Sequence, residues 1–586
     1  MGHKIKKEEY KKNVFDYIVI GAGTAGGVVA KKLTDDRHTS VLVLEPGINS
    51  TALLSSPNIL NAISLSSDNK FAFNLLSRLE PSIQRQLVTI NGRVIGGSSE
   101  VNYMFAVRGS RELYDEWAAL VGSDQWSYNQ VRPLFIENET YTGQTQSPNE
   151  RGRKGPIFVR QQHIPPNGLI ETLTNATAKV LDIDIVVDYN TGVRDCTFYK
   201  NQFIQKEIGS TLTRSSTATG YLNECIVTQG NEFHPDELGV GKRRLIIFAK
   251  TTVNKILFKK KERKMIAIGV EYVKNGVSHK SFARKGIIVS AGFFSSVILQ
   301  RSGIGKSCDL INAGITPLIE NPNVGHNLQT QAYAGLGVEV DTSQILPIFA
   351  ADPNQPIALG AFKSEHVNSL EGRRLQLQGA PAPIFLPAQD VASNGWELDF
   401  TKLTNIMSFG IIDLDPRSRG TIMAAHSDPE ALPSFSFNPL QSNTNDLNFM
   451  VDQYINTYNI IREARINNSG IHKVVYPPEE IFTIPDEVEK RRRLGDYVRA
   501  SYSNFYHYGG QCKMAKCIQD GVVNELLDVF GTKNLKVADL SISPILPDGN
   551  TSIPVQMIGL NAARIIQNNP HPYVAHDDDF DYESEN

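Results

Sequence analysis

Three glycines near the start of the chain, Gly21, Gly23 and Gly26, have the spacing of a phosphate-binding turn. A β-branched and aromatic run at 15–20 precedes them and predicts a strand, and an alanine- and valine-rich stretch to Leu33 follows and predicts a helix. Gly21 permits the tight turn, Gly23 lets the backbone approach a pyrophosphate, and Gly26 lets the helix pack against the strand. The helix N-terminus then offers free N–H groups to that pyrophosphate.

A carboxylate follows this turn at the distance where nucleotide-binding turns place an acceptor for the ribose hydroxyls. The second apolar run, 41–44, ends at Glu45, which lies 19 residues after Gly26. At the end of that strand Glu45 can accept hydrogen bonds from the ribose hydroxyls of an ADP group. The turn, completed by Thr24 and Ala25, therefore predicts a dinucleotide with an ADP half. It does not separate NAD from FAD, but Glu45 disfavours NADP, because the 2′-phosphate would meet a like charge.

A second glycine-rich segment, GRVIGGSSEVNYMFAVRGSRELYD at 92–115, could also contact a ligand. Gly97 allows close backbone approach, and the hydroxyl of Ser98 can meet a phosphate oxygen. Asn102 carries an amide that can both donate and accept a hydrogen bond. Taken alone, the segment is better explained as a glycine-rich surface turn.

The segment 92–115 closely resembles the first signature of the glucose-methanol-choline (GMC) oxidoreductases, which use FAD. The stretch 288–305, IVSAGFFSSVILQRSGIG, resembles the second signature of that family in its latter half. Its first half departs from the pattern, because Phe293 and Phe294 replace the usual small residues. Two signatures in family order, after the glycine turn, favour FAD over NAD.

Further family elements follow in the same order. Residues 323–329 resemble the next element, although Thr-Gln at 330–331 stands where Asp-His is usual. The segment 506–514, YHYGGQCKM, resembles the segment that carries the catalytic histidine of the family. The last matches are 535–541 and 547–554, which resemble the closing flavin-binding strand and loop.

The resemblance implies an α/β fold with two domains, an α+β arrangement. A Rossmann-like FAD-binding domain is joined to a substrate domain built on a mixed or antiparallel sheet. The expected FAD-binding pieces are 13–160, 220–330 and 530–568, the substrate pieces are 161–219 and 331–529, and the tails are 1–12 and 569–586.

The resemblance also implies which residues contact FAD. Val253 stands where the family contacts the adenine through its backbone, and Asp539 where it holds the linker of the flavin. Some relatives attach FAD covalently through a histidine near position 101, but 100–102 is Glu-Val-Asn, so we predict a dissociable cofactor. The expected contacts are Gly21, Gly23, Thr24, Ala25, Gly26, Glu45, Arg93, Gly97, Ser98, Asn102, Val253, Asp539, Ser552 and Ile553.

Two residues of the C-terminal part are suited to alcohol oxidation. His507 is the one histidine inside the matching catalytic segment, and its ordinary pKa near neutrality suits a base that removes the hydroxyl proton. Asn550 stands where the family has His or Asn, and its amide could hydrogen-bond the substrate oxygen. Tyr506 and Tyr103 predict an aromatic wall that favours apolar or aromatic alcohols, although ordinary core packing explains them equally well. Molecular oxygen or another acceptor would then reoxidise the flavin.

Two other functions are compatible with the same fold. The run 506–510 is also similar to that of hydroxynitrile lyases of the family, in which flavin is present but is not reduced. The FFSSVILQRSGIG version of the second signature and the segment 476–480 resemble GMC proteins of giant viruses, which can be packaged structural components. Nucleic acid is an expected neighbour only in that last case, and the virion is then the expected location.

The cysteine pattern favours a reducing compartment for this chain. The net charge is −3, so nothing favours an obligate nucleic-acid partner. Five cysteines with no CxxC pair argue against a disulfide framework, and no His, Cys or acidic spacing predicts a metal site. No apolar run reaches the roughly 18 residues that a membrane helix needs, and the N-terminus does not resemble a signal peptide. We therefore expect a cytoplasmic enzyme with no membrane partner.

Overall fold

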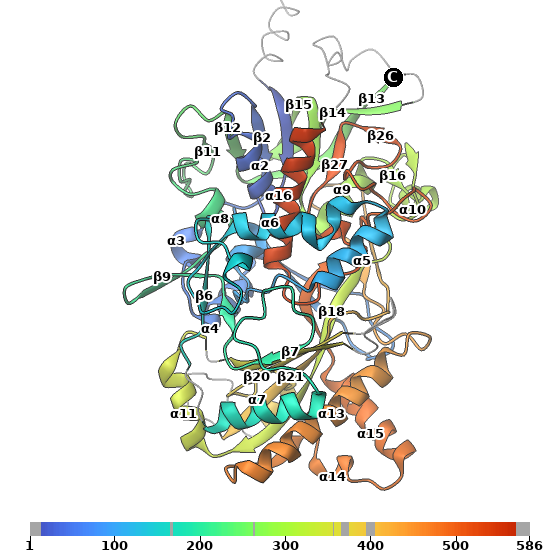
Figure 1. Cartoon of the computed structure of the whole chain (residues 1–586). Coiled ribbons are helices and arrows are strands. Elements are labelled where there is room, and N and C mark those ends of the chain that lie inside the picture. Colours follow the sequence, from blue (N-terminus) through green and yellow to red (C-terminus); the bar gives the residue numbers. More distant parts are fainter. Residues whose placement is uncertain are drawn as a thin grey trace, which may run out of the picture.

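The computed structural model has two large β-sheets, one above the other in Figure 1, with helices outside them. It describes residues 13–164, 168–261, 264–355, 357–364, 374–393 and 405–569. The expected tails 1–12 and 569–586 lie outside the described residues, except for Asn569.

The upper sheet has nine strands and a parallel centre. β1 pairs in parallel with β2 on one side and with β15 on the other. Both faces of this centre are covered, which explains the continuous apolar runs of β1 and β2. In spatial order the strands are β11 (Glu237–Leu238), β12 (Leu245–Phe248), β2 (Val41–Leu44), β1 (Val14–Ile20), β15 (Val277–Val289), β14 (Lys264–Lys274) and β13 (Thr251–Lys261), with β26 (Thr532–Lys533) beside β14 and β27 (Leu535–Val537) beside β15.

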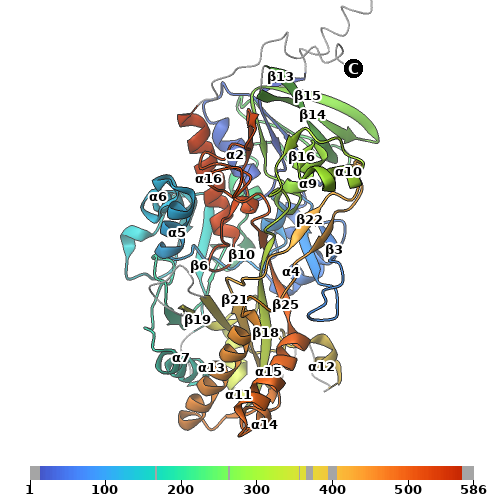
Figure 2. The same cartoon turned by 90° about the vertical axis from the view of Figure 1, so that its right-hand side faces the viewer.

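Two helices that are distant in sequence pack together against this sheet, α2 (Gly26–Leu33) and α16 (Ser552–Asn568) (Figures 1 and 2). Their backbones approach closely at Gly559, where an added Cβ would lie 2.8 Å from the carbonyl oxygen of Ala25. The other helices of the upper half are α5 (Arg111–Val121), α6 (Tyr128–Asn138), α8 (Thr217–Tyr221), α9 (Ser295–Arg301) and α10 (Ser307–Asn312).

The parallel strands of the upper sheet end at one edge, as expected for a nucleotide-binding sheet. Gly21 follows β1, Glu45 follows β2, Ser290 follows β15, and Ala538 and Asp539 follow β27. Residues from four distant stretches of sequence therefore meet at this carboxyl edge.

The lower sheet has seven strands, and all of its pairings are antiparallel. One face packs an apolar core against α7 (Gly168–Leu181), α13 (Asp446–Asn467) and α15 (Glu487–Ser501), which lie below the sheet in Figure 1. The strands in order are β24 (Ile471–Tyr476), β18 (Gln329–Val340), β21 (Ile406–Asp413), β20 (Arg374–Ala380), β19 (Ala358–Ser364) and β7 (Cys196–Phe198), with β25 (Ser503–Gly509) also paired to β18.

The opposite face of the lower sheet carries polar side chains. Side chains alternate along a strand, so the neighbours of the core residues Ala332, Leu375 and Leu377 point away from the helices. Gln331 and Gln376 are such neighbours, and both hydrogen-bond to the loop that precedes α16. This face therefore looks toward the carboxyl edge of the upper sheet.

The remaining elements connect the two large sheets or extend their rims. Small sheets are formed by β3 (Ala72–Leu76) with β4 (Val88–Gly92), β5 (Glu139–Tyr141) with β6 (Ile157–Gln161) and β8 (Gln202–Phe203), β9 (Gln205–Ile208) with β10 (Thr211–Arg214), β16 (Ile304–Gly305) with β17 (Ile319–Glu320), and β22 (Thr421–Met423) with β23 (Ser434–Ser436). The remaining helices are α3 (Thr51–Leu54), α4 (Ile59–Ser66), α11 (Thr342–Ala351), α12 (Ala388–Ser393), α14 (Glu479–Phe482) and the short η1 (Gly97–Glu100), η2 (Asp124–Trp126), η3 (Pro148–Glu150), η4 (Gly292–Phe294) and η5 (Leu540–Ile542).

The predicted fold class agrees with these two sheets, one with a parallel Rossmann-like centre and one antiparallel. The expected divisions at 160/161 and 330/331 fall inside β6 and β18, so the exact domain limits remain a proposal. All five cysteines are free in the structure. In the part of the chain that the structure describes, no helix has both the length and the apolar character to cross a membrane.

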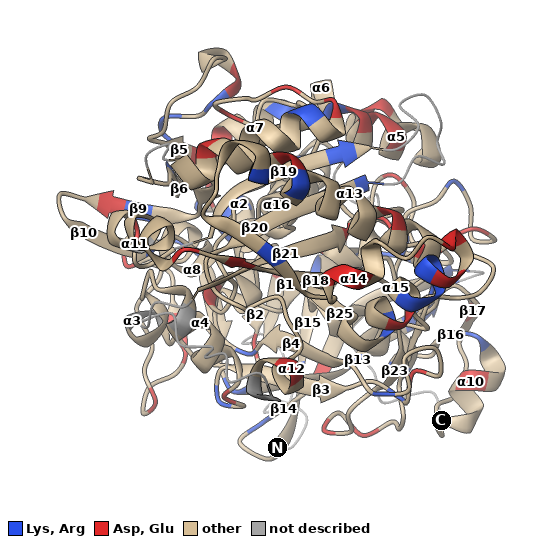
Figure 3. Cartoon of the chain, turned by 90° about the horizontal axis from the view of Figure 1, so that it is seen from below, with Lys and Arg blue, Asp and Glu red and all other residues tan. Residues whose placement is uncertain are grey.

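Charged residues of both signs are interspersed on the helices that cover the lower sheet (Figure 3). On α15, Lys490 pairs with Glu487 at 2.7 Å and Arg492 with Glu489 at 2.7 Å, both on the surface. A different ion pair is buried, between Arg160 of β6 and Asp352 at the end of α11, with contacts of 2.8 and 3.2 Å.

We predict that Asp352→Ala lowers stability by about 3–5 kcal/mol, because it leaves the buried Arg160 guanidinium without its counter-charge. The measurement is the thermal midpoint of the FAD-loaded protein. Lys490→Ala, which breaks an exposed pair, is the control and should leave that midpoint unchanged. Equal midpoints for the two variants would contradict the prediction.

Candidate active site

The turn after β1 excludes side chains at two of its glycines. Gly21 has a φ of +100°, and a Cβ there would lie 2.6 Å from the carbonyl oxygen of Ser290. A Cβ on Gly26 would lie 2.0 Å from the carbonyl oxygen of Gly21. Both contacts are with backbone atoms that cannot move aside, so α2 can start this close to β1 and β15 only with glycine at both positions.

The two glycine-rich segments approach each other directly. Gly97 has a φ of +58°, and a Cβ there would lie 2.7 Å from Cα of Gly23. The N–H of Gly96 donates to the carbonyl of Ala22 over 2.8 Å. A Cβ on Gly23 would meet nothing nearer than 3.8 Å, so that side of the turn stays open to a ligand. This backbone cradle beside the start of α2 fits a pyrophosphate.

Glu45 is bound into the same turn. Its two carboxylate oxygens accept the N–H of Ala22 at 3.0 Å and the N–H of Gly47 at 2.9 Å. Burial raises the pKa of Glu45 to about 7, against the lowering effect of these two donors and of Arg93. The backbone oxygen of Glu45 accepts from Thr251, which brings the start of β13, and so Val253, to the same edge.

The first-signature residues border the turn without crowding it. Ser98 is exposed, and its hydroxyl accepts the N–H of Gly92 at 3.1 Å. The guanidinium of Arg93 lies over the ring of Phe73, 4.9 Å from its centre. The carbonyl of Thr24 accepts from Thr217, and Ala25 directly precedes α2.

The amide oxygen of Asn102 is engaged, whereas its NH₂ group has no hydrogen bond to the part of the chain that the structure describes. Its Oδ1 accepts from Nη1 of Arg214 at 2.7 Å and from the N–H of Met104 at 3.1 Å. The carboxylate of Glu100 is buried beside it, and burial raises the pKa of Glu100 although Arg214 opposes the shift. The NH₂ group of Asn102 is therefore the part that can reach a ligand.

Asp539 ties the end of β27 to the start of α9. One oxygen accepts from the N–H of Gly292 at 2.9 Å and from the hydroxyl of Ser295 at 2.6 Å, and the other accepts from the N–H of Ser541 at 2.8 Å. Burial raises the pKa of Asp539, and these donors oppose that shift. The carboxylate thus keeps the residues after β15 against the turn at Gly21.

The first turn of α16 also faces this edge. Ile553 is buried, and the buried hydroxyl of Ser552 has no hydrogen-bond partner among the described residues. Because the first N–H groups of a helix also lack intrahelical partners, this terminus can bind a polar ligand group.

His507 lies in a large bulge of β25. Thr330 and Ala332 of β18 pair with Tyr508 and Asn504, so one residue of β18 faces three residues of β25, 505–507. The middle residue of the three, Tyr506, has a left-handed φ of +60°. Bulges and left-handed residues of this kind are found next to active sites, where they redirect side chains.

The residue of β18 opposite this bulge is Gln331, and it binds the imidazole. Nδ1 of His507 lies 2.6 Å from Oε1 of Gln331, and the ring of Phe505 contacts the imidazole edge-on at 4.9 Å. His507 lies deep in the protein while part of its surface remains accessible. Burial lowers the pKa of His507 to about 3, so the imidazole is neutral at physiological pH.

The loop before α16 brings Asn550 to the same place. Nε2 of Gln331 donates to the carbonyl of Pro547 at 2.6 Å, and Nε2 of Gln376 donates to Oδ1 of Asn550 at 3.2 Å. His507 and Asn550 are therefore joined through Gln331 and one short loop.

The same loop is anchored by Asp548. Its carboxylate accepts from the N–H and the hydroxyl of Ser110, at 2.9 and 2.5 Å, and lies 3.4 Å from Nη1 of Arg374. Arg374 also pairs with Glu116 at 2.9 Å. The charges behind the loop are thus paired with one another.

An aromatic cluster adjoins the histidine through Phe505. Tyr506 contacts Tyr103 edge-on, with ring centres 6.4 Å apart, so the two expected substrate residues lie together. Tyr333 contacts Phe505 at 6.0 Å and Phe385 at 5.8 Å. Burial raises the pKa of Tyr506 to about 12, so this aromatic cluster is uncharged.

Comparisons with known proteins agree with this geometry. Family models described as GMC oxidoreductase match residues 15–333 and 416–559. This chain belongs to the GMC oxidoreductase family. The predicted family and fold class are thereby confirmed, whereas the giant-virus branch remains a prediction.

Relatives of this GMC oxidoreductase match over nearly their whole length. It is 28% identical to the oxygen-dependent choline dehydrogenase of Chromohalobacter salexigens, covering 95% of this chain and 96% of the relative. Among solved structures it resembles pyridoxine 4-oxidase from Mesorbium loti, with a TM-score of 0.75 at 21% identity over 95% and 100% of the two chains. It also resembles a formate oxidase variant of Aspergillus oryzae RIB40, studied for FAD modification, with a TM-score of 0.77 at 19% identity over 95% and 98%.

Three residues of the candidate site in this GMC oxidoreductase are not predicted as site residues by its sequence. Gln331 was visible only as a departure from the usual Asp-His pair. Gln376 left a weaker signal, the alternation of glutamine and leucine in RLQLQGA at 374–380, which is typical of a strand with one polar face. Tyr333 left none, because its position depends on the pairing of β18 with β25.

The unusual Phe293 and Phe294 of the second signature have a packing role. Phe293 contacts Phe435 at 5.1 Å and Tyr508 at 5.4 Å, and Phe294 contacts Phe73 at 5.0 Å. They join η4 to the core of the lower half.

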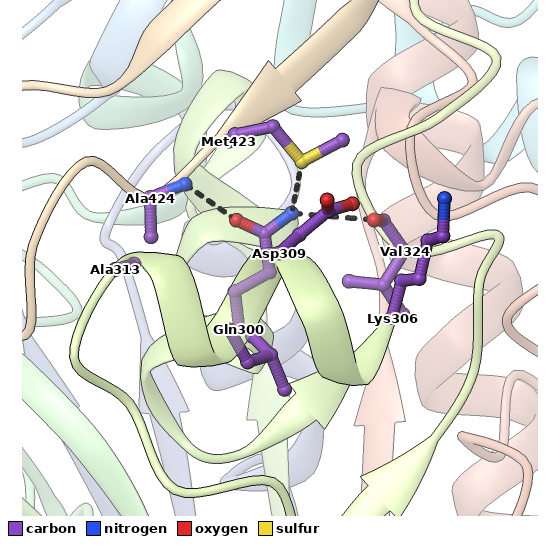
Figure 4. A pocket seen from close by; sticks show the side chains of 8 residues that line it. Gln300, Lys306, Asp309, Ala313, Val324, Met423 and Ala424 are labelled. Atoms are coloured by element: carbon purple, nitrogen blue, oxygen red, sulfur yellow. Dashed lines mark hydrogen bonds between the residues drawn. The ribbon is translucent and has the colours of Figure 1, made fainter.

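A small pocket lies apart from this site, between α9, α10 and β22 (Figure 4). It holds about 10 Å³, the volume needed for about one water molecule. Both ends of the Gln300 amide are hydrogen-bonded there. Its Oε1 accepts from the N–H of Ala424, and its Nε2 contacts the carbonyls of Val324 and Ile422 and the sulfur of Met423. The pocket is therefore structural. Among the described residues, no three His, Cys, Asp or Glu side chains are grouped as metal ligands.

We predict that Gly97→Ala abolishes stoichiometric FAD binding, because the new methyl group would push against Cα of Gly23. The measurement is the flavin content of the purified protein from its visible absorbance. Gly209→Ala is the matched control, since Gly209 has a similar φ of +61° and nothing within 4 Å of its Cβ position. Full flavin content in the Gly97 variant would refute this role.

Proposed function

We propose that this GMC oxidoreductase is an FAD-dependent alcohol oxidase or dehydrogenase in which His507 is the base. FAD, when bound, supplies the hydride acceptor that the chemistry needs. The observation that carries the proposal is the link from His507 through Gln331 to the loop of Asn550, beside a cradle that fits the cofactor.

The predicted cofactor, FAD, is supported by family membership and by the backbone cradle at Gly23 and Gly97. In this proposal the cradle and the start of α2 hold the pyrophosphate, Glu45 the ribose and Val253 the adenine. Asp539 and the first turn of α16, at Ser552 and Ile553, hold the flavin half. Arg93, Ser98 and Asn102 then lie along the side formed by the first signature.

The flavin is proposed to be non-covalent, since residues 100–102 include no histidine. We therefore predict that acid precipitation releases the flavin into the supernatant, measured by its absorbance there. Flavin retained in the washed pellet would mean a covalent bond.

In this proposal His507 and Asn550 have different roles at the alcohol oxygen. The neutral imidazole accepts the hydroxyl proton, and the amide of Asn550 donates to the oxygen as alkoxide character develops. Gln376 holds Asn550 by its Oδ1, which leaves the NH₂ group for the substrate.

The substrate class follows from the surroundings of His507. We infer a small alcohol whose apolar or aromatic body lies against Tyr103 and Tyr506. The buried Oε1 atoms of Gln376 and Gln378 have no partner among the described residues, so the substrate can carry a second hydrogen-bond donor. Molecular oxygen or another acceptor then takes the electrons from the reduced cofactor.

We predict that anaerobic addition of a suitable primary or benzylic alcohol bleaches the bound flavin. His507→Asn should slow this reduction by roughly 10²–10⁴-fold, the usual contribution of a general base, while the flavin stays bound. The rate of flavin reduction is measured by stopped flow.

His163→Asn, at an exposed histidine paired with Glu207, is the control and should reduce at the parent rate. No bleaching by any alcohol of a broad panel, in protein with bound FAD, would overturn the proposal. Cyanide release from mandelonitrile without flavin reduction would instead favour the hydroxynitrile lyase alternative.

A further inference from the structure

The side chain of Gln331 has only one orientation that satisfies both of its neighbours. The carbonyl of Pro547 can only accept a hydrogen bond, so the NH₂ group of Gln331 must face it, over 2.6 Å. The amide oxygen of Gln331 must then face Nδ1 of His507, over 2.6 Å. The backbone carbonyl therefore settles which end of the buried amide meets the imidazole.

This orientation determines where the imidazole carries its proton. An amide oxygen has no proton to give, so a hydrogen bond of 2.6 Å to it requires Nδ1 of His507 to be the donor. In the neutral ring only one nitrogen is protonated, which leaves Nε2 as a bare acceptor. Among the described residues, Nε2 of His507 has no hydrogen-bond partner.

Among the described residues, no charged side chain hydrogen-bonds to Gln331 or to His507. The imidazole contacts the ring of Phe505 on β25 and the amide of Gln331 on β18, and Phe505 in turn contacts Tyr333. Burial alone lowers the pKa of the imidazole. The adjoining loop carries the charged Asp548, and β20 carries the charged Arg374. They contact each other at 3.4 Å and are further paired with Ser110 and Glu116. A carboxylate in place of Gln331 would instead put a negative charge against the ring.

We propose that Gln331 is the positioning residue that holds His507 in its Nδ1–H form, so that Nε2 receives the alcohol proton, and that its neutrality keeps this step independent of pH near neutrality. This inference rests on the proposed function. With FAD bound, the alcohol would give its O–H proton to Nε2 of His507, its C–H hydrogen would leave with both electrons of the bond to the hydride acceptor that FAD supplies, and the product would be the carbonyl compound. Gln331 keeps the Nδ1 proton throughout and exchanges none.

The test compares Gln331→Glu and Gln331→Leu with the parent, all as FAD-loaded proteins, by the rate of anaerobic flavin reduction from pH 5 to 9. The parent rate should have no inflection near the ordinary pKa of histidine. Gln331→Glu should raise the pKa of His507, because the carboxylate favours the imidazolium. The charged form then prevails below the raised pKa, so the rate should fall on the acidic side.

Gln331→Leu should lose roughly 10- to 100-fold in the reduction rate, because the ring and its tautomer are no longer held, while substrate affinity changes little. Gln162→Glu is the control for placing a carboxylate at a buried bridging glutamine; its Nε2 donates to the carbonyls of Gln355 and Ile357. That control should show no acidic inflection. An unchanged profile in Gln331→Glu, or parent rates in Gln331→Leu, would overturn the inference.

A second measurement does not depend on any substrate. In protein labelled with ¹⁵N-histidine, the signals of His507 are those that disappear in His507→Asn. Their ¹⁵N shifts should show Nδ1 protonated in the parent and a mixture of tautomers in Gln331→Leu. A protonated Nε2 in the parent would refute the inference even if alcohols reduce the flavin. Failure of every alcohol to reduce it would instead count against the proposed function alone.

Discussion

The loop between β27 and α16 is the constraint on which the candidate site depends. It leaves the upper sheet and is then held by side chains of the lower sheet: Gln331 binds Pro547, Arg374 contacts Asp548, and Gln376 binds Asn550. These bonds are buried, where an unmade hydrogen bond costs about 1–3 kcal/mol, so the loop has one well-defined position. The two sheets are thereby joined where the proposed chemistry takes place.

The cofactor end of the site depends on backbone contact rather than on side chains. Gly97 approaches Gly23 and Gly26 approaches Gly21 so closely that a methyl group fits at neither Gly97 nor Gly26. Glu45 and Asp539 then use both carboxylate oxygens to hold backbone N–H groups of the same edge. A rigid, preformed cradle of this kind binds a dinucleotide without paying again for the ordering of loops.

The side chains at the proposed substrate end of the site are uncharged. Burial keeps the imidazole of His507 and the phenol of Tyr506 uncharged, and the described charges nearby are paired. In the proposed reaction, one nitrogen of the His507 imidazole can therefore accept a proton with no permanent charge in contact with the ring. This differs from sites in which a carboxylate supports the histidine, and it makes the identity of residue 331 chemically important.

The sequence alone accounts for the features of this protein that depend on contiguous residues. It determined by itself the glycine turn at Gly21, the carboxylate at Glu45, the family and the two-sheet fold, because these depend on local spacing and on motifs of contiguous residues. The place of Gln331 and Gln376 beside His507 and Asn550 was decided only by tertiary structure. It depends on which face of β18 and β20 is turned inward, on a bulge of β25, and on a loop more than 170 residues away in sequence from either glutamine. Strand register and long-range pairing, which no local pattern encodes, brought those amides to the imidazole.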